Sequence, residues 1–373
     1  MKKKICIITS SRADYGLLKN LILNIQNNNS LQLQLIVSGS HLSKEYGYSK
    51  KEIINDKVKI SREVKVIQRK NSPGDICKSF SLAINGFSEA YKNLRPDCLV
   101  YLGDRYEILA AAYAGLIHNI PKIHIHGGEL TEGVIDDATR HAITKVSDFH
   151  FVSHKKYQDR VIQLGENPKS VYLVGAMGIE NIEKIKTLPL LDIEKKFHIE
   201  LSEKIFLVTL HPMTLSQQLT KETINNLLKV LSIFKDYSII FTSPNQDTYR
   251  DIIEKKIREF IKKRKKSYFI KNLGSQNYFS IVKLSKCVIG NSSSGILEVP
   301  SFKIPTINIG TRQKGRISAR STINCQNSIS SIKKAIYKAL KLNFKKINNP
   351  YRYKNQKPSL EIIKFLRKQD LKK

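Results

Sequence analysis

The feature that most constrains the fold is a short apolar run followed by a turn and a helical stretch, repeated along all 373 residues. The runs occupy residues 4–9, 31–37, 64–66, 98–102, 122–125, 149–152 and 171–174, and then 205–210, 237–241, 268–270, 287–289 and 306–309. Segments with helical periodicity, such as 15–26, 76–93 and 220–235, lie between them. Nearly continuous apolar strands that alternate with helices are typical of parallel sheets covered on both faces. The chain is therefore predicted to be α/β.

The two series of strands predict two doubly wound, Rossmann-like domains. Residues 178–203 separate the series, and this stretch is polar and helical with little strand character. The length suits two cores, and a hydrophobic content of 41% can fill them. We predict an N-terminal domain over residues 1–178 and a C-terminal domain over 179–358. Residues 359–373 are expected to form an amphipathic helix that packs back across the domain junction.

The bulk composition limits the classes of function. A formal charge of +32 suggests nucleic-acid binding, but the lysines are spread along the chain, no nucleic-acid-binding motif is present, and no tryptophan can stack on bases. A basic surface that attracts phosphate anions is the interpretation that we favour. No apolar run is long enough to span a membrane, and the apolar part of the N-terminus is too short for a signal peptide. Five scattered cysteines without a CxxC pair indicate a reduced, cytoplasmic protein.

Polar or glycine-rich residues follow seven of the predicted strands, at the point where each strand ends. In doubly wound sheets, ligands bind beyond the carboxyl ends of the strands, so residues just after each apolar run matter most. We therefore expect these seven strand ends to form the functional site. They begin at Ser10, Gly103, His126, His211, Asn245, Gly290 and Gly310.

Residues 290–298 follow a predicted strand and open a predicted helix. Small residues let the backbone approach a ligand closely, and a helix N-terminus offers free N–H groups to a diphosphate. Ser292 and Ser293 add hydroxyl donors, and Glu298 is expected about one turn inside the helix, where its carboxylate can accept hydrogen bonds from both ribose hydroxyls. A serine-capped helix without a ligand is the alternative interpretation.

Other strand ends supply cations and imidazoles. Arg312 can reach the same phosphates, and Arg12 lies where a helix begins, in a segment that matches neither GxGxxG nor the P-loop pattern. His211 is interpreted as a donor to phosphate oxygen, with a buried structural histidine as the alternative. His124 and His126 are two residues apart but lack a local carboxylate signature. We therefore expect no metal and no cofactor.

Carboxylates gather in the first half of the chain. Asp104 and Arg105 are adjacent at a strand end, where they can act on a ligand or form an ion pair within the domain. If a helix begins at Asp136, then Asp136 and Arg140 are neighbours one turn apart, which can be helix decoration alone. Carboxylates on a glycine-rich loop between two candidate strands nonetheless favour an acid/base array for a sugar.

Taken in order, these motifs resemble those of the hydrolysing UDP-N-acetylglucosamine 2-epimerases of sialic-acid biosynthesis. The resemblance extends from about residue 4 to 315 and includes Arg12-Ala-Asp-Tyr-Gly16, Gly103-Asp-Arg-Tyr-Glu107, His126-Gly-Gly-Glu129, Gly290-Asn-Ser-Ser-Ser-Gly295 and Gly310-Thr-Arg-Gln313. It implies the two-domain architecture of the GT-B glycosyltransferases with the site in the interdomain cleft. It also implies a dimer or tetramer that converts the UDP-sugar UDP-GlcNAc and water into N-acetylmannosamine (ManNAc) and UDP.

The resemblance implies a role for each matched residue. UDP leaves by elimination across C1–C2, which gives a 2-acetamidoglucal, and water then adds with inversion at C2. Asp104 and Asp136 match two acids of the family that are implicated in this catalysis. Nucleotide contacts are implied for Arg12, Arg105, His211, Asn245, Ser292, Ser293, Glu298 and Arg312.

Position 126 departs from the family pattern, because several members carry a glutamate where this chain has His126. We expect His126 to take part in proton transfer, since the unperturbed pKa of histidine lies near neutrality. The alternative is that catalysis rests on Asp104 and Asp136, together with Glu129, which is also the candidate sugar contact. The histidine form is also similar to the branch that acts on UDP-N,N'-diacetylbacillosamine on the way to legionaminic acid, so both substrates stay open.

Other classes of function are weaker interpretations. A retaining glycosyltransferase of the same fold needs an acceptor-binding element, and none is evident. A non-hydrolysing 2-epimerase starts with Gly-Thr-Arg-Pro-Glu, where this chain has Ser11-Arg-Ala-Asp-Tyr15. A sugar-nucleotide sensor has no need of Asp104 and Asp136 at the site.

Overall fold

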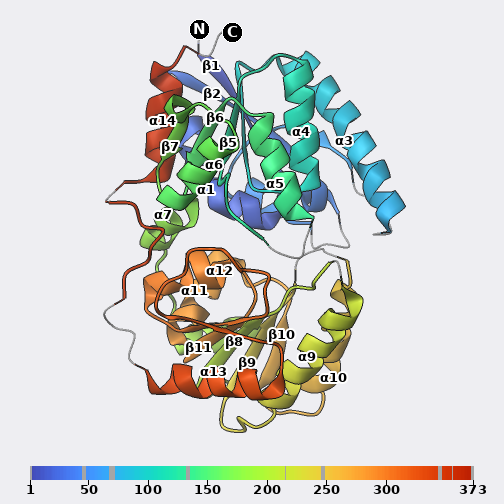
Figure 1. The fold of residues 1–373 in the computed structure, drawn as a ribbon, viewed down its shortest axis with the longest axis vertical. Helices are drawn as coiled ribbons and strands as arrows, with labels where there is room; N and C mark the ends of the chain where they lie inside the picture. The colour runs from blue at the N-terminus through green and yellow to red at the C-terminus, as the bar shows by residue number, and fades with distance from the viewer. Residues whose placement is uncertain are drawn as a thin grey trace. The chain divides into compact units, whose positions relative to one another are not determined.

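The structure is a computed structural model that describes residues 2–43, 48–66, 72–131, 135–214, 216–244, 248–342, 347–354 and 356–370. The chain divides into two compact units, which are drawn as a ribbon in Figure 1. The first unit comprises Met1–Glu129, Asp136–Asn181 and Tyr351–Lys373, and the second comprises Leu130–Ile135 and Ile182–Pro350. The chain thus returns to the first unit at Tyr351, inside the segment 179–358 that was assigned to the C-terminal domain from sequence.

The first unit is built on one parallel sheet of seven strands in the order β3-β2-β1-β4-β5-β6-β7. The strands are β1 (Lys3–Thr9), β2 (Leu31–Ser38), β3 (Ile60–Val64), β4 (Cys98–Leu102), β5 (Lys122–Ile125), β6 (Phe149–Val152) and β7 (Val171–Leu173). The helices are α1 (Arg12–Gln26), α2 (Lys50–Asn55), α3 (Pro73–Leu94), α4 (Tyr106–Ile117), α5 (Asp136–Lys145), α6 (Lys155–Gln163), α7 (Met177–Lys184) and α14 (Pro358–Lys368), with the short 3-10 helices η1 (Gly39–Leu42) and η2 (Pro168–Ser170).

Alternate side chains of β1 enter two separate cores in this unit. Ile5 and Ile7 pack with residues of α1, α7 and α14, whereas Cys6 and Ile8 pack with residues of α3 and α4. Figure 1 shows α7 and α14 on one side of the sheet and α3 and α4 on the other. Both faces of the sheet are therefore covered, as near-continuous apolar strands require.

The second unit repeats this plan with six parallel strands in the order β10-β9-β8-β11-β12-β13. The strands are β8 (Ile205–Thr209), β9 (Ser238–Thr242), β10 (Ser267–Ile270), β11 (Cys287–Gly290), β12 (Thr306–Ile309) and β13 (Thr322–Cys325). The helices are α8 (Leu190–Phe197), α9 (Gln217–Leu231), α10 (Arg250–Ile261), α11 (Gly274–Leu284), α12 (Ser294–Leu297) and α13 (Ile329–Lys341), with the 3-10 helix η3 (Val299–Phe302). One core packs α9, α10 and α13 on the sheet, and another packs α8, α11 and η3 on its other face.

The prediction of an α/β protein with two doubly wound sheets is confirmed. The C-terminal helix is α14, which packs against α1 of the first unit. Lys3 Nζ donates hydrogen bonds to the carbonyls of Leu366 and Gln369 at 2.7 and 2.8 Å, which ties the two ends of the chain together. Among the helices that the structure describes, none is long and apolar enough to cross a membrane.

Each sheet contains one point at which the strand order reverses. In the first sheet this switch point lies between β1 and β4, and in the second it lies between β8 and β11. Chains that leave two such strands turn to opposite faces of the sheet, which opens a ligand crevice at their carboxyl ends. The predicted site residues after β1, β4, β8 and β11 therefore lie where each fold accommodates a ligand.

Candidate functional site

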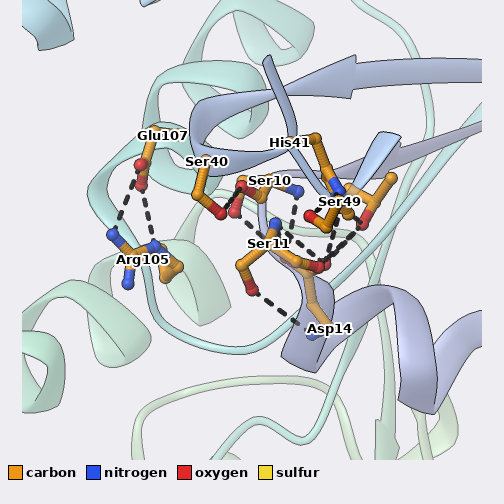
Figure 2. A network of polar contacts seen from close by, with 9 residues as sticks. Ser10, Ser11, Asp14, Ser40, His41, Ser49, Arg105 and Glu107 are labelled. Carbon is orange, nitrogen blue, oxygen red and sulfur yellow. Dashed lines mark hydrogen bonds and ion pairs between the residues drawn. The ribbon is translucent and has the colours of Figure 1, made fainter. Parts of the chain in front are cut away.

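Arg12 lies at the switch point of the first unit, at the first position of α1. The turn before it is held by a capping box, because Ser11 Oγ accepts from the Asp14 N–H at 3.3 Å and the Asp14 carboxylate accepts from the Ser11 N–H at 3.1 Å (Figure 2). The Arg12 side chain is exposed. The strand end thus presents a cation on a fixed turn, which suits contact with an anionic ligand.

Asp104 and Arg105 follow β4 at the same switch point, and each contacts a residue of a helix. Arg105 donates from Nε and Nη2 to the carboxylate of the buried Glu107, at 3.2 and 3.4 Å (Figure 2). Asp104 forms an ion pair with Arg140 of α5. An adjacent guanidinium favours the ionised form of a carboxyl group. Asp104 is therefore placed as an oriented carboxylate.

Arg140 links two of the predicted strand ends. Besides its ion pair with Asp104, it donates from Nη1 to the Glu129 carbonyl at 2.8 Å, and it is almost fully buried. Asp136, at the start of α5, is half-buried one turn earlier on the same helix. The α5 motif is therefore more than helix decoration, because its arginine reaches the ends of β4 and β5.

His126 directly follows β5 and has a left-handed backbone, with a φ of 65°. Its Nε2 accepts a hydrogen bond from the Met177 N–H at 3.1 Å, and its Nδ1 lies 3.4 Å from Glu129 Oε1. Glu129 also accepts from Ser153 Oγ at 2.8 Å. Because Nε2 is an acceptor here, the ring proton is assigned to Nδ1. Both His126 and Glu129 are buried. Their roles in proton transfer and in sugar contact stay predictions.

His124 supports the end of β4 from the neighbouring strand. Its Nε2 lies 2.8 Å from the Gly103 carbonyl, and its Nδ1 lies 3.2 Å from Thr144 Oγ1. Burial lowers the pKa of His124 to about 3, so the ring is neutral and donates from Nε2. Within the described part of the chain, no group of three or more His, Cys, Asp or Glu side chains is placed to hold a metal ion.

His211 follows β8 at the switch point of the second unit. The side chain of Asn291, at the end of β11, accepts from the His211 N–H at 2.6 Å and donates to the His211 carbonyl at 2.9 Å. Gln313 in turn donates to the Asn291 carbonyl at 2.8 Å. Burial, with a further contribution from the charge of Arg312, lowers the pKa of His211 well below its ordinary value. A neutral imidazole beside a guanidinium is suited to hydrogen bonding with an anion.

The segment 290–298 differs from the sequence-based expectation in one respect. The helix α12 has only four residues, and Glu298 stands at its C-terminal end, so the prediction that Glu298 lies one turn inside a helix is wrong. The α-helix stops because Pro300 supplies no N–H, and the chain continues as η3. Ser292, Ser293 and Glu298 are all half-buried.

Tyr278 of α11 adds an unpredicted side chain beside this segment. Its hydroxyl donates to Ser294 Oγ at 3.0 Å. Burial raises the pKa of Tyr278, and the charge of Glu298 adds to this shift. Tyr278 therefore places a phenol group close to the predicted ribose contact. The sequence offered no signal for it, since no motif led to the helix after β10.

A pocket of about 190 Å³ lies at the carboxyl ends of β8, β11, β12 and β13 in the second unit. His211, Asn291 and Thr311 contribute to its wall, and Thr220 and Thr223 of α9 close another side. The second unit thus brings three predicted strand ends together. The predicted contact Asn245 lies outside the described residues.

The chain matches known proteins over most of its length. Residues 23–367 match the family model described as UDP-N-acetylglucosamine 2-epimerase. A Campylobacter jejuni protein named GDP/UDP-N,N'-diacetylbacillosamine 2-epimerase (hydrolyzing) is 44% identical over 87% of this chain and 85% of its own length. The polysialic acid biosynthesis protein P7 of Escherichia coli is 42% identical over 86% of this chain and 82% of its own length.

A solved structure has the same fold. The crystal structure of UDP-GlcNAc 2-epimerase from Neisseria meningitidis bound to UDP-GlcNAc superimposes with a TM-score of 0.82 and 16% sequence identity, covering 98% of this chain and 100% of that chain. At this identity the likeness concerns the fold alone. The family follows from the sequence matches together with the motifs at the two switch points: the chain belongs to the UDP-N-acetylglucosamine 2-epimerase family.

Proposed function

We propose that the chain is a hydrolysing 2-epimerase that converts UDP-GlcNAc and water into ManNAc and UDP. The observation that carries the hydrolytic reaction is the 44% identity, over 87% of this chain, to a relative whose name states a hydrolysing 2-epimerase, and UDP-GlcNAc is favoured by the family model that matches residues 23–367. Several of the predicted residues follow strands at the two switch points, Arg12, Asp104 and Arg105 in the first unit and His211, Ser292 and Ser293 in the second, which supports the same conclusion.

The reaction requires a base and a stabilised leaving group. A base removes the proton at C2 while the bond between C1 and the diphosphate oxygen breaks, and UDP leaves with that electron pair. Water then bonds at C1 of the glucal and a proton adds at C2 from the opposite face. We assign the acid and base steps to Asp104 and Asp136, because Arg140 orients the Asp104 carboxylate at the end of β4.

Stabilisation of the departing UDP is assigned to cations and hydrogen-bond donors. Arg12 and Arg105 supply positive charge in the first unit, and Arg312 supplies it in the second. The neutral His211 beside Arg312 can donate to a phosphate oxygen without adding a second cation. Ser292, Ser293 and Glu298 are assigned to the nucleoside end, together with Asn245.

A second substrate is favoured by the names of two relatives. The C. jejuni protein and a Legionella pneumophila protein, 31% identical over 94% of this chain, are both named for N,N'-diacetylbacillosamine. The alternative is therefore the same hydrolytic epimerisation of UDP-N,N'-diacetylbacillosamine. The two substrates differ at C4 and C6, away from the C1–C2 bond that reacts, so the assigned chemistry is the same for both.

Product analysis with both nucleotide sugars tests the proposal. The pure protein is incubated with each in turn, and ³¹P and ¹H NMR follow UDP and the free amino sugar, with Asp104→Asn as the control. UDP with ManNAc supports the main proposal, and UDP with the free 2-epimer of diacetylbacillosamine alone supports the alternative. UDP-ManNAc without free sugar indicates a non-hydrolysing epimerase and overturns both.

A further inference from the structure

A network of buried polar side chains joins the ends of β1 and β2 beneath the turn that carries Arg12 (Figure 2). Its members are Thr9, Ser10, Asp14, His41 and Ser49, and each is at most 7% exposed. Apart from Asp14, they lie outside the helix cap already described. Polar groups buried at this density are normally retained because every one of them is hydrogen-bonded.

Asp14 is the acceptor at the centre of this network. Its carboxylate receives hydrogen bonds from the Ser10 N–H and Ser10 Oγ at 3.0 Å each, from the Ser11 N–H at 3.1 Å, and from Thr9 Oγ1. Burial alone would raise the pKa of Asp14, but hydrogen bonding and charge from His41, with the hydrogen bonds from Thr9 and Ser10, lower it below its ordinary value. Asp14 is therefore an ionised carboxylate that fixes two consecutive backbone amides.

The direction of each hydrogen bond follows from the donors available. Thr9 gives its hydroxyl proton to Asp14, so it accepts from His41 Nε2 at 2.9 Å. The Nδ1 of His41 lies 2.8 Å from Ser49 Oγ, and Ser49 makes no side-chain capping bond to α2. His41 thus donates to Thr9, and Thr9 donates to Asp14.

The next strand end clamps the same turn from its other side. Ser40 donates from its N–H and its Oγ to the Ser10 carbonyl, at 2.8 and 3.1 Å. Gly39 makes this approach with a φ of 54°, and a Cβ there would overlap the Ser10 carbonyl. Both the N–H and the C=O of Ser10 are thus held by buried partners.

We propose that Asp14, oriented by His41 through Thr9, is a positioning residue that holds Arg12 ready for the diphosphate of the nucleotide. This inference rests on the proposed function, in which Arg12 contacts the departing UDP. Arginine is long and flexible, and much of its contribution to binding is lost when its backbone must be ordered at the same time. A turn whose amides are already bound to Asp14 removes that cost.

A double-mutant cycle on UDP affinity tests the inference, because it detects action through Arg12. Titration calorimetry measures the Kd of UDP for the full chain, Asp14→Asn, Arg12→Ala and the double variant. We expect Asp14→Asn to weaken UDP binding about tenfold, as the loss of one charge-assisted hydrogen bond implies. In the Arg12→Ala background the same change alters Kd less than about twofold.

Equal losses in both backgrounds, or no loss in the Asp14→Asn single variant, overturn the inference and leave the proposed function intact. Failure of the unaltered chain to bind UDP overturns the proposed function and this inference with it. Asp56→Asn is the matched control, because Asp56 also bonds to α1, through Tyr15 at 2.8 Å and Lys19 at 2.6 Å, without touching the turn. It is expected to leave the Kd unchanged.

Variants of His41 keep the test decisive if Asp14→Asn fails to fold. His41→Gln retains an N–H donor for Thr9, whereas His41→Ala retains none. We expect UDP affinity to stay within about threefold for His41→Gln and to fall about tenfold for His41→Ala. Equal affinities for these two variants contradict a role for the donor chain. Melting temperatures by circular dichroism show that each variant is folded.

Discussion

Asp104 is the residue on which the proposed chemistry depends most directly. Its carboxylate pairs with Arg140 and can receive a proton from the sugar, so Asp104→Asn is expected to lower kcat about 10² to 10⁴-fold. The Kd of UDP stays within about threefold, because Asp104 is not assigned to the nucleotide. Steady-state kinetics and calorimetry measure the two effects. Asp137→Asn is the control, because Asp137 lies on α5 with Arg140 and is 3.8 Å from His141. A kcat for Asp104→Asn equal to that of the control contradicts the assignment.

His126 has a measurable structural contribution whatever its part in catalysis. His126→Ala leaves the buried Met177 N–H without its acceptor, which costs about 1–3 kcal/mol in the free energy of unfolding. His154→Ala is the matched control, because His154 also accepts one backbone N–H, from Lys156 at 3.1 Å, in a less buried place. Urea unfolding compares the two variants. Unchanged stability together with a kcat as low as that of Asp104→Asn would instead support proton transfer by His126.

The sequence predicted which polar residues follow the strands, but it did not predict which residues they pair with. Asp104 and Arg105 were found because each follows an apolar run. Their actual partners, Arg140 and Glu107, depend on how α4 and α5 pack, and adjacency in sequence says nothing about that packing. His41 was missed although it follows the second predicted strand, because a Gly-Ser-His turn matches no motif.

At the scale of elements, the backbones of β8 and β11 approach each other closely at their carboxyl ends. Gly290 has a φ of 142°, and a Cβ there would overlap the Thr209 carbonyl at the end of β8. We expect Gly290→Ala to lower the free energy of unfolding by roughly 2–4 kcal/mol. Gly16→Ala is the control, because nothing lies within 4 Å of its Cβ position in α1, and it is expected to raise stability by about 0.5–1 kcal/mol. Similar effects of the two variants in urea unfolding contradict this account of the strand ends.

Strands buried on both faces were readable from the sequence, whereas the edge strands β3 and β13 were not. The central strands β4, β5 and β12 have the bounds that their apolar runs predicted. The edge strand β13 was missed because Ile323 is its only deeply buried residue, and β3 was placed a few residues too late because most of it is partly exposed. The sequence of residues 290–298 favours a helix start, but Pro300 ends α12 after four residues.

At the scale of the molecule, neutral buried histidines make stability depend on pH. Burial lowers the pKa of His124 to about 3 and also lowers those of His150 and His211. The unfolded chain therefore binds protons first, near pH 6.5, so stability is complete above that pH and is lost as the pH falls toward 3. Between pH 7.5 and 5, we expect the free energy of unfolding to fall by about 2 kcal/mol from His124 alone.

Urea unfolding followed by circular dichroism at the two pH values measures this effect. His124→Gln is expected to reduce the pH slope of the stability by about one proton, because glutamine does not titrate. His198→Gln is the matched control, because His198 is exposed. Equal stability at both pH values contradicts the account.

The division into two doubly wound units was predictable because two complete strand series precede the C-terminal helix. The return of the chain at Tyr351 was not, because residues 351–357 carry no apolar periodicity. This return is held by specific contacts, such as that of Ser359 Oγ with Glu180 Oε1 at 2.8 Å. A homo-oligomer stays a prediction that sedimentation analysis can test.

The most direct test of the central claim is ¹H NMR of the reaction with UDP-GlcNAc in D₂O. Elimination and re-addition of solvent predict UDP and free ManNAc that carries deuterium at C2, because the abstracted C2 proton is replaced from solvent. If the diacetamido nucleotide is the true substrate, its free 2-epimer carries the deuterium instead. Release of a free sugar with protium at C2, or with unchanged configuration, would contradict hydrolytic epimerisation.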